Sequence, residues 1–336
     1  MDNNFYSCHR LEKFNLHLLA MKMEKPVCLC CEPLENLPGV SLDGASEDVF
    51  KHLKDIRDNI LSEGYLDLDD PKRKYTNTCK KCIFYKKDIW KAERAIQELT
   101  FGLYPSPCQS KCFYCSVWED CLKGDQPEAV SDYYDKMLNF VEYIKDNDFI
   151  DKNARWNIAS GEITIHPYRE RLLNAVGNSK CRFFTNMFKY DERIAANLSA
   201  NSKSTVFLSI DAGTKETWRK IKGVDNFERV LENLFKYRDI SEPGQIMLKY
   251  IIFPGINDDD ENFEAVAKIM SLLNSSGNCI SRDTREKYDI DSEKMNIIMD
   301  SYARLVSVFE KYDLAYDLWD LSPEQKLQVV ANARKL

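Results

Sequence analysis

The chain has 336 residues, 44% of them hydrophobic, and a formal net charge of −7. This composition predicts a folded protein with a sizeable core, and the acidic balance with interspersed signs excludes the basic footprint of a nucleic-acid-binding protein. No apolar run approaches the roughly 18 residues of a membrane-spanning helix, and the start at Met1–Phe5 lacks the basic and apolar regions of a signal peptide. We therefore expect a cytoplasmic protein whose partners are neither membranes nor nucleic acids.

The twelve cysteines indicate metal ligation, because disulfides are rare in the reducing compartment expected for a chain without an export signal. Nine of them fall within the first 115 residues, so metal chemistry is expected there. These nine are Cys8, Cys28, Cys30, Cys31, Cys79, Cys82, Cys108, Cys112 and Cys115, while Cys121, Cys181 and Cys279 are isolated.

The most informative stretch is Pro107–Cys115, where Cys108, Cys112 and Cys115 have the spacing CxxxCxxC. Thiolates are soft ligands that suit iron–sulfur clusters, zinc and Cu(I). A cubane cluster has four irons, so three protein ligands leave one iron open to a group that is not protein. The alternative is a structural zinc site that is completed by a distant fourth ligand.

The first 90 residues predict a small cysteine-rich α+β segment. Short apolar runs predict two strands at 16–21 and 27–31, and apolar residues at helical spacing predict a helix over 48–61. Cys79 and Cys82 then form a CxxC knuckle that can present two sulfurs to one metal.

Residues 91–290 alternate strands with helices, a pattern that predicts a parallel sheet with ligands bound at the carboxyl ends of its strands. The expected strands are 99–103, 155–159, 182–185, 205–210, 246–252 and 278–281, and the expected helices are 131–145, 192–198, 215–221, 227–237 and 260–273. Two further helices, over 292–312 and 322–334, are expected to cover the sheet.

The CxxxCxxC loop and the segment Ser160–Gly161–Glu162 after the second strand resemble the cluster loop and the GGE motif of the radical S-adenosylmethionine (SAM) superfamily. The resemblance covers about residues 97–285 and implies a partial (β/α)6 barrel whose [4Fe–4S] cluster binds SAM at its open iron. It also implies SAM contacts at the strand ends, among them Ser209 or Asp211, which share a face if the strand continues with period two. The implied contacts are Ser160, Gly161 and Glu162 for the ammonium, Ser209 or Asp211 for the ribose, Arg219 for the carboxylate, and Asn186 facing the same cavity.

Four earlier cysteines resemble the ligands of the auxiliary-cluster modules called twitch and SPASM domains: Cys8, Cys30, Cys79 and Cys82, with Cys31 as the substitute for Cys30. The resemblance implies a second [4Fe–4S] cluster, in a module that here precedes the barrel instead of following it. A zinc knuckle on the same thiols is the alternative. The expected domains are the auxiliary module at 1–90, the barrel at 91–290 and a helical cover at 291–336.

The resemblance implies an enzyme that reductively cleaves SAM to a 5'-deoxyadenosyl radical, which then abstracts hydrogen from a substrate C–H bond. A fully ligated second cluster can take an electron from the substrate radical, which favours an oxidative outcome, and relatives with such modules often modify peptides. The implied partners are a peptide or small-molecule substrate and an electron donor such as flavodoxin or ferredoxin.

Other outcomes stay open. Epimerisation needs a hydrogen donor such as the thiol of Cys279 or Cys181, and the alternative to peptide oxidation is epimerisation or dehydrogenation of a sugar-type small molecule. Asp283, just after the last strand, is a candidate substrate contact, whereas His166 is expected to pack or to form a hydrogen bond. The alternative of another class is a zinc-stabilised binding protein without enzymatic activity, which would be colourless where an iron–sulfur protein is brown.

Overall fold

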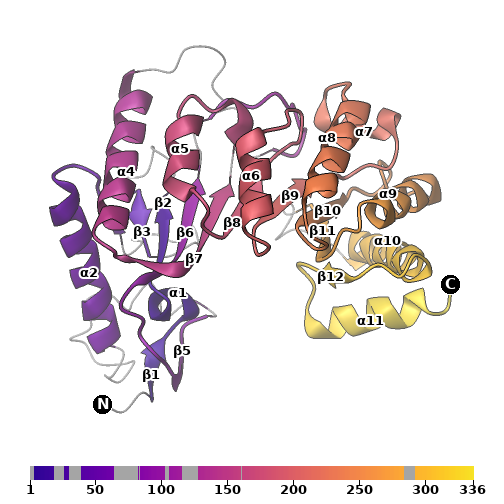
Figure 1. Ribbon diagram of the computed structural model, residues 1–336. Coiled ribbons are helices and arrows are strands. Elements are labelled where there is room, and N and C mark those ends of the chain that lie inside the picture. Colours follow the sequence, from indigo (N-terminus) through magenta and orange to yellow (C-terminus); the bar gives the residue numbers. More distant parts are fainter. Residues whose placement is uncertain are drawn as a thin grey trace. The chain divides into compact units, whose positions relative to one another are not determined.

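The structure is a computed structural model that describes residues 4–18, 26–29, 39–63, 82, 84–102, 106–115, 128–159, 161–283 and 292–336. The chain divides into two compact units, the first containing residues 1–107 and 120–181 and the second containing residues 108–119 and 182–336. Figure 1 shows the strands and helices of both. Within the described ranges, no helix combines the length and the apolar character that crossing a lipid bilayer requires.

A mixed sheet forms the centre of the first unit. Its β2, β6 and β7 run parallel, whereas β3 and β4 are antiparallel additions at one edge. The two strands predicted at 16–21 and 27–31 are observed as β2 and β3, which pair with each other through His17 and Cys28. Since β2 also pairs with β6, the sheet continues across the predicted domain boundary at residue 90, and the boundary itself stays a prediction. The strand order is β4 (Gly39–Val40), β3 (Val27–Cys28), β2 (Asn15–Leu18), β6 (Ile96–Gly102) and β7 (Ile150–Ala159).

The helices of the first unit are α2 (Ser46–Glu63), α4 (Glu128–Asp146) and α5 (Arg169–Val176). In Figure 1, α4 lies beside both α2 and α5, and it packs against both. Its apolar residues recur at helical spacing and are buried, as predicted. They are Tyr134, Met137, Leu138, Val141 and Ile144.

A separate antiparallel pair of strands joins the start of the chain to a segment about 80 residues later. It consists of β1 (Asn4–Ser7) and β5 (Lys86–Ile89), and Ser7 pairs with Lys86. The rings of Tyr6 and Tyr85 stack at 6.0 Å across this pair. The short helix α1 (His9–Glu12) follows β1 directly.

The second unit is built on a parallel sheet in which β8, β9, β10, β11 and β12 are neighbours in that order. Its strands are β8 (Cys181–Phe184), which belongs to this unit from Arg182 on, β9 (Thr205–Ser209), β10 (Ile246–Ile252), β11 (Asn278–Arg282) and β12 (Tyr316–Leu318). Its helices are α6 (Glu192–Ala200), α7 (Lys215–Lys222), α8 (Phe227–Ile240), α9 (Asp260–Leu272), α10 (Ser292–Lys311) and α11 (Pro323–Ala333).

The two faces of β10 show why this segment forms a strand in a sheet covered by helices. Leu248, Tyr250 and Ile252 are fully buried on one face, where the ring of Tyr250 contacts Phe263 of α9 at 6.0 Å. Lys249, on the opposite face, is only partly buried. This alternation is the expected period of a strand.

The predicted mixed α/β fold with parallel strands is confirmed, as are the strands and helices expected over 91–290. The helices predicted over 292–312 and 322–334 are observed as α10 and α11, and the cover itself stays a prediction. Between them, Tyr316–Leu318 adds the unpredicted strand β12 to the edge of the sheet beside β11. The helices α1 and α5 and the strands β1, β4 and β5 were not predicted, since they are short or carry no clear period.

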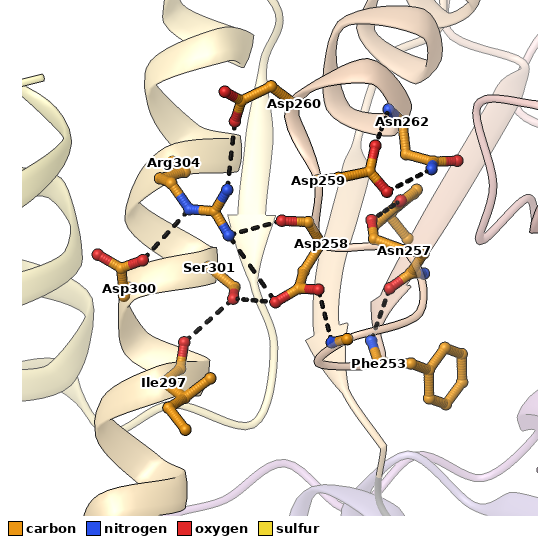
Figure 2. A network of polar contacts seen from close by, with 12 residues as sticks. Phe253, Asn257, Asp258, Asp259, Asp260, Asn262, Ile297, Asp300, Ser301 and Arg304 are labelled. Atoms are coloured by element: carbon orange, nitrogen blue, oxygen red, sulfur yellow. Dashed lines mark hydrogen bonds and ion pairs between the residues drawn. The ribbon is translucent and has the colours of Figure 1, made fainter.

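A polar network fastens α10 to the loop that precedes α9 (Figure 2). Arg304 of α10 donates to the carbonyl of Asp258 at 2.5 Å and forms ion pairs with Asp260 and Asp300, both at 3.2 Å. Ser301 of α10 donates to a carboxylate oxygen of Asp258 at 3.0 Å. One guanidinium, the side chain with the most donors, thus links α10 to the segment Asp258–Asp260 at the start of α9.

Candidate active site around the cysteine loop

The cysteine loop, residues 108–115, belongs to the second unit and carries the three predicted cluster ligands. Cys108, Cys112 and Cys115 are thiols rather than half-cystines, and all three are partly exposed. By contrast, Cys181 and Cys279 are almost fully buried, at 1% and 2% exposure. Accessible sulfurs are a requirement for binding a metal and a small ligand, and the loop cysteines meet it.

The carboxyl end of α7 holds this loop by its backbone. The N–H of Lys111 donates to the carbonyl of Lys222 at 2.8 Å, and the N–H of Phe113 donates to the carbonyl of Ile221 at 3.2 Å. The last carbonyls of a helix have no partner within the helix, so the loop satisfies two of them. α7 itself ends at Gly223, which adopts a left-handed conformation with φ of 68°.

A buried polar network joins the same loop to α7 and to the end of β9. The hydroxyl of Tyr114 donates to the carboxylate of Asp211 at 2.6 Å, and the ammonium of Lys222 reaches that carboxylate at 2.5 Å and the Tyr114 hydroxyl at 2.7 Å. Asp211 and Lys222 are 0% and 4% exposed. Burial, with Asp211 beside the phenol, raises the pKa of Tyr114 well above its ordinary value, so the phenol stays protonated and donates.

Asp211 is held from a third side by the neighbouring strand and its loop. Its second carboxylate oxygen accepts the N–H of Ile251 at 2.9 Å, and its carbonyl accepts the side-chain amide of Asn257 at 2.8 Å. Asn257 also accepts the N–H of Phe253 at 2.7 Å, as Figure 2 shows. Both carboxylate oxygens of Asp211 are thus engaged inside the protein, which favours a structural role for this residue.

The reason that Asp211 departs from the predicted face is its backbone. β9 ends at Ser209, and Asp211 has a φ of 51°, which is outside the extended region where side chains alternate. The premise that Ser209 and Asp211 share a face therefore fails. Ser209, partly exposed at the carboxyl end of β9, stays the predicted ribose contact.

Asn186 lies against the cysteine loop. Its side-chain amide is 3.7 Å from the sulfur of Cys108 and donates to Gln109 at 2.9 Å. A hydrogen bond to a ligand sulfur orients the ligand and tunes the metal it holds. The predicted SAM contact Arg219 is an exposed residue of α7, and its role stays a prediction.

The GGE-like segment belongs to the first unit. Glu162 is fully buried, and one of its carboxylate oxygens accepts the N–H and the hydroxyl of Thr164 at 3.0 and 2.7 Å. The N–H of Glu162 points to the hydroxyl of Ser106 at 3.4 Å. Gly161 has a φ of 76°, a value that favours glycine, and Ser160 lies outside the described residues.

His166 is a packing residue, as predicted. It is 3% exposed, its Nδ1 accepts the N–H of Tyr168 at 3.1 Å, and its ring meets that of Tyr134 edge-on at 4.6 Å. Burial lowers the pKa of His166 to about 4. The imidazole is therefore neutral at pH 7.

Two of the predicted auxiliary ligands lie close together in the first unit. Cys8 follows β1 and Cys82 precedes β5, so the pairing of these strands places both cysteines at the same end. Burial raises the pKa of the Cys8 thiol, the N–H groups of Leu11 and Arg10 oppose this, and the neighbouring Cys82 adds to it. The remaining predicted ligands, Cys30 or Cys31 and Cys79, lie outside the described residues.

The other weak candidates lie in or beside the parallel sheet. Cys279 of β11 is in register with Lys249 of β10, which is in register with Ser209 of β9. Burial raises the pKa of Cys279 to about 11, and its thiol donates to the carbonyl of Gly277 at 3.4 Å. Asp283 follows β11 and is partly buried.

The chemistry of the donor set fits an iron–sulfur cluster. Within the described ranges, no three His, Cys, Asp or Glu side chains are already gathered at a metal-binding distance. The loop nevertheless offers three soft, accessible sulfurs and an amide donor at the first of them. The same three sulfurs also suit zinc, so the identity of the metal has to come from other observations.

The comparisons with known proteins supply one. Residues 106–267, which include the cysteine loop and the β8–α9 segment, match the family model described as the radical SAM superfamily. The chain carries a radical SAM superfamily domain. The prediction of a radical SAM enzyme is thus confirmed at the level of the superfamily. No curated protein matches the chain.

Several solved structures are similar to this chain. SuiB of Streptococcus suis bound to the precursor peptide SuiA is 15% identical, covers 84% of this chain and 56% of its own, and has a TM-score of 0.49. A radical SAM methyltransferase from Sphaerobacter thermophilus is 12% identical, with coverages of 63% and 64% and a TM-score of 0.44. HydG, a maturase of the [FeFe]-hydrogenase, is 13% identical, with coverages of 67% and 53% and a TM-score of 0.46. The chain spans about half the length of the SuiB chain.

The anchoring residues of the loop are the part of the site that sequence reasoning missed. Tyr114, Lys222 and Gly223 carry no metal-ligand pattern, and Lys222 reads as an ordinary residue at the polar end of a helix. The one available signal was the pair Lys222–Gly223, since glycine marks the end of a helix. Nothing in the sequence indicated that this end faces the cysteine loop.

Proposed function

We propose that this chain is a radical SAM enzyme whose cluster is held by Cys108, Cys112 and Cys115. The observation that carries the proposal is the set of three accessible thiols on an anchored loop, inside the range that matches the superfamily model. When bound there, a [4Fe–4S] cluster with one open iron supplies the electron that cleaves SAM into methionine and a 5'-deoxyadenosyl radical.

The chain's own residues position the reactants. Asn186 orients Cys108 through its amide. Ser209, at the carboxyl end of β9, is proposed to hold a ribose hydroxyl, and Arg219 is proposed to pair with the SAM carboxylate. Ser160, Gly161 and Glu162 remain the proposed contacts of the SAM ammonium.

Aromatic side chains pack beneath one part of the loop, although Phe113 itself is 42% exposed. The ring of Phe253 packs against those of Phe113 and Tyr114 at 4.9 and 5.2 Å, and Phe253 and Ile251 are buried beside them. This apolar packing adds to the backbone contacts that hold the loop in place, and in that way it supports the proposed chemistry.

We further propose that the substrate is a peptide and that the net reaction is an oxidation. After one hydrogen atom is abstracted, the substrate radical would lose an electron and, to solvent, a proton. A second [4Fe–4S] cluster, which Cys8, Cys82, Cys79 and Cys30 or Cys31 would hold, would supply the acceptor for that electron. The closeness of Cys8 and Cys82 supports this second centre. Flavodoxin or ferredoxin is the proposed donor to the first cluster.

A second candidate function, epimerisation, is favoured by one observation. Cys279 of β11 is in register with Lys249, which is in register with the proposed ribose contact Ser209, so its thiol is the proposed donor for hydrogen return. Epimerisation would leave the substrate mass unchanged, whereas oxidation would remove two hydrogens. Mass spectrometry of candidate peptides and sugar-type small molecules, after incubation with SAM and dithionite, separates the two outcomes.

The proposed cluster is tested by anaerobic reconstitution with iron and sulfide. We expect brown protein with about eight irons per chain if both centres are clusters and about four if the N-terminal one is zinc. The variant Cys112→Ala should lose the irons of one cluster and all formation of 5'-deoxyadenosine. The matched variant Cys181→Ala, which removes a buried cysteine that is not part of the loop, should lose neither. A colourless zinc protein, or 5'-deoxyadenosine formed by Cys112→Ala, would show that the proposal is wrong.

A further inference from the structure

The carboxyl end of α7 reaches the cysteine loop in two ways at one residue. The backbone carbonyl of Lys222 accepts the N–H of Lys111, while its side chain donates to the hydroxyl of Tyr114. These two loop residues flank Cys112 on either side. Lys222 therefore restrains both the backbone at Lys111 and the side chain of Tyr114. These two residues lie just before Cys112 and just before Cys115.

The charge of the Lys222 ammonium is compensated within the protein. The ammonium of Lys222 and the carboxylate of Asp211 are both nearly or fully buried, and they lie 2.5 Å apart. The ammonium also lies over the rings of Tyr114 and Trp218, at 5.0 and 5.4 Å from their centres. A buried charge is tolerated when it is paired and hydrogen-bonded, so the network is self-sufficient and does not need a ligand to compensate it.

We propose that Lys222 is a positioning residue for the cysteine loop, which it holds in the conformation that presents Cys112 and Cys115 for metal binding. The anchoring follows from the contacts of the loop itself, whereas its consequence for a cluster rests on the proposed function. Asp211 has the supporting part, because it fixes the ammonium and is itself fixed by Ile251 and Asn257.

The anchoring is tested first on the metal-free chain, by the rate at which iodoacetamide alkylates individual cysteines, read by mass spectrometry of peptides. Removing the ammonium should let the loop open more often, so Lys222→Met should raise the alkylation rates of Cys112 and Cys115 about tenfold, the effect of losing one charge-assisted hydrogen bond. The rate of the buried Cys181 should not change. Lys220→Met, at an exposed position of the same helix, is the matched control and should behave like the parent chain.

Two further variants keep the test interpretable, because Lys222→Met leaves Asp211 as a buried charge without its cation. In the double variant Asp211→Asn with Lys222→Met, the amide oxygen can still accept from Ile251 and no charge is left unpaired, so the unit should fold. Its loop cysteines should nevertheless alkylate about as fast as those of Lys222→Met. Lys222→Arg keeps a donor for Tyr114 and should restore slow alkylation.

The consequence for the cluster is read spectroscopically. We expect Lys222→Met and the double variant to bind less iron at the loop and to lose the change that SAM causes in the electron paramagnetic resonance spectrum of the reduced cluster, and we expect Lys222→Arg to keep both. Parental alkylation rates in the double variant would overturn the proposal, and so would normal iron and spectra in the presence of fast alkylation. Failure of the parent chain to bind iron would refute the proposed function and would leave the alkylation result to decide the anchoring.

Discussion

Gly223 approaches Lys111 so closely that a methyl group at position 223 would lie 2.8 Å from the Cβ and 2.9 Å from the carbonyl oxygen of Lys111. The residue also has a φ of 68°, where side chains other than hydrogen are disfavoured. Both the end of α7 and its contact with the cysteine loop therefore depend on a missing side chain.

Replacing Gly223 should separate the cost of its left-handed backbone from the effect of its close approach to Lys111. Gly223→Ala should lower the free energy of unfolding by about 1–2 kcal/mol for the left-handed backbone and, in addition, speed alkylation of the loop cysteines because Lys111 must move. Gly255→Ala is the matched control, since Gly255 has a φ of 75° with open space around the position of a Cβ. It should show the loss of stability in urea unfolding without faster alkylation. Equal alkylation in the two variants would contradict the close approach.

Asn186→Leu should lower the reduction potential of the proposed loop cluster. The amide of Asn186 lies 3.7 Å from the sulfur of Cys108, and hydrogen bonds to ligand sulfurs favour the reduced, more negative cluster. A loss of about 1 kcal/mol corresponds to a shift on the order of 40 mV for one electron. A redox titration followed by electron paramagnetic resonance measures it. Gln109→Leu, which removes the other partner of the same amide, should leave the potential nearly unchanged.

The free energy of unfolding should fall as the pH is lowered from 6.5 to 4, because His166 is buried in its neutral form. Burial lowers the pKa of His166 from 6.5 to about 4, so the unfolded chain takes up a proton before the folded one does. The contribution is complete above pH 6.5 and decreases as the pH falls, by about 2 kcal/mol on reaching pH 5.

Urea unfolding at several pH values checks this dependence. His166→Asn, whose side-chain oxygen can still accept from the N–H of Tyr168, should reduce the slope between pH 6.5 and 5. His17, whose pKa burial also lowers to about 4, should account for a further part of it. His52→Asn, at an exposed position of α2, should keep the parental slope. An unchanged slope in His166→Asn would rule out the assigned neutral state.

Arg304→Met should detach α10 from the loop that precedes α9. Arg304 is partly exposed and binds the carbonyl of Asp258 and the carboxylates of Asp260 and Asp300, so we expect a loss of about 1–2 kcal/mol in urea unfolding that shrinks at high salt. The exposed pair of Lys311 and Glu264 provides the comparison, and Lys311→Met should cost less than about 0.5 kcal/mol. Equal losses in the two variants would argue against a shared anchor at Arg304.

Regular elements with a clear hydrophobic period were predictable, and irregular ones were not. The stripe that ends in Val141 and Ile144 and the alternation around Tyr250 gave α4 and β10 directly. β5 escaped prediction because its sequence Lys86–Ile89 is polar and exposed, and its partner β1 lies about 80 residues away. Pairing over such a distance leaves no local pattern.

The candidate site shows the same division. The cysteine spacing was readable because ligand spacing is a local property. By contrast, Tyr114 contacts Asp211 and Lys222, which follow it by 97 and 108 positions in the sequence. The prediction that Ser209 and Asp211 share a face extended the period-two rule two residues past the end of β9, where the backbone is no longer extended. The left-handed backbone at Asp211 is a tertiary outcome, stabilised by Asn257 from another loop.

The pairing of β1 with β5 also has a consequence for how metal removal would affect the first unit. It brings Cys8 and Cys82 to one end of a small ribbon and so closes a ring of about 75 residues, whose entropic cost grows only slowly with its length. A metal ion bound by both thiols would cross-link the two ends of that ring. The cross-link would stabilise the folded state by lowering the conformational entropy of the unfolded chain. Chelators should then loosen the amino-terminal ribbon before they affect the parallel sheet of the second unit.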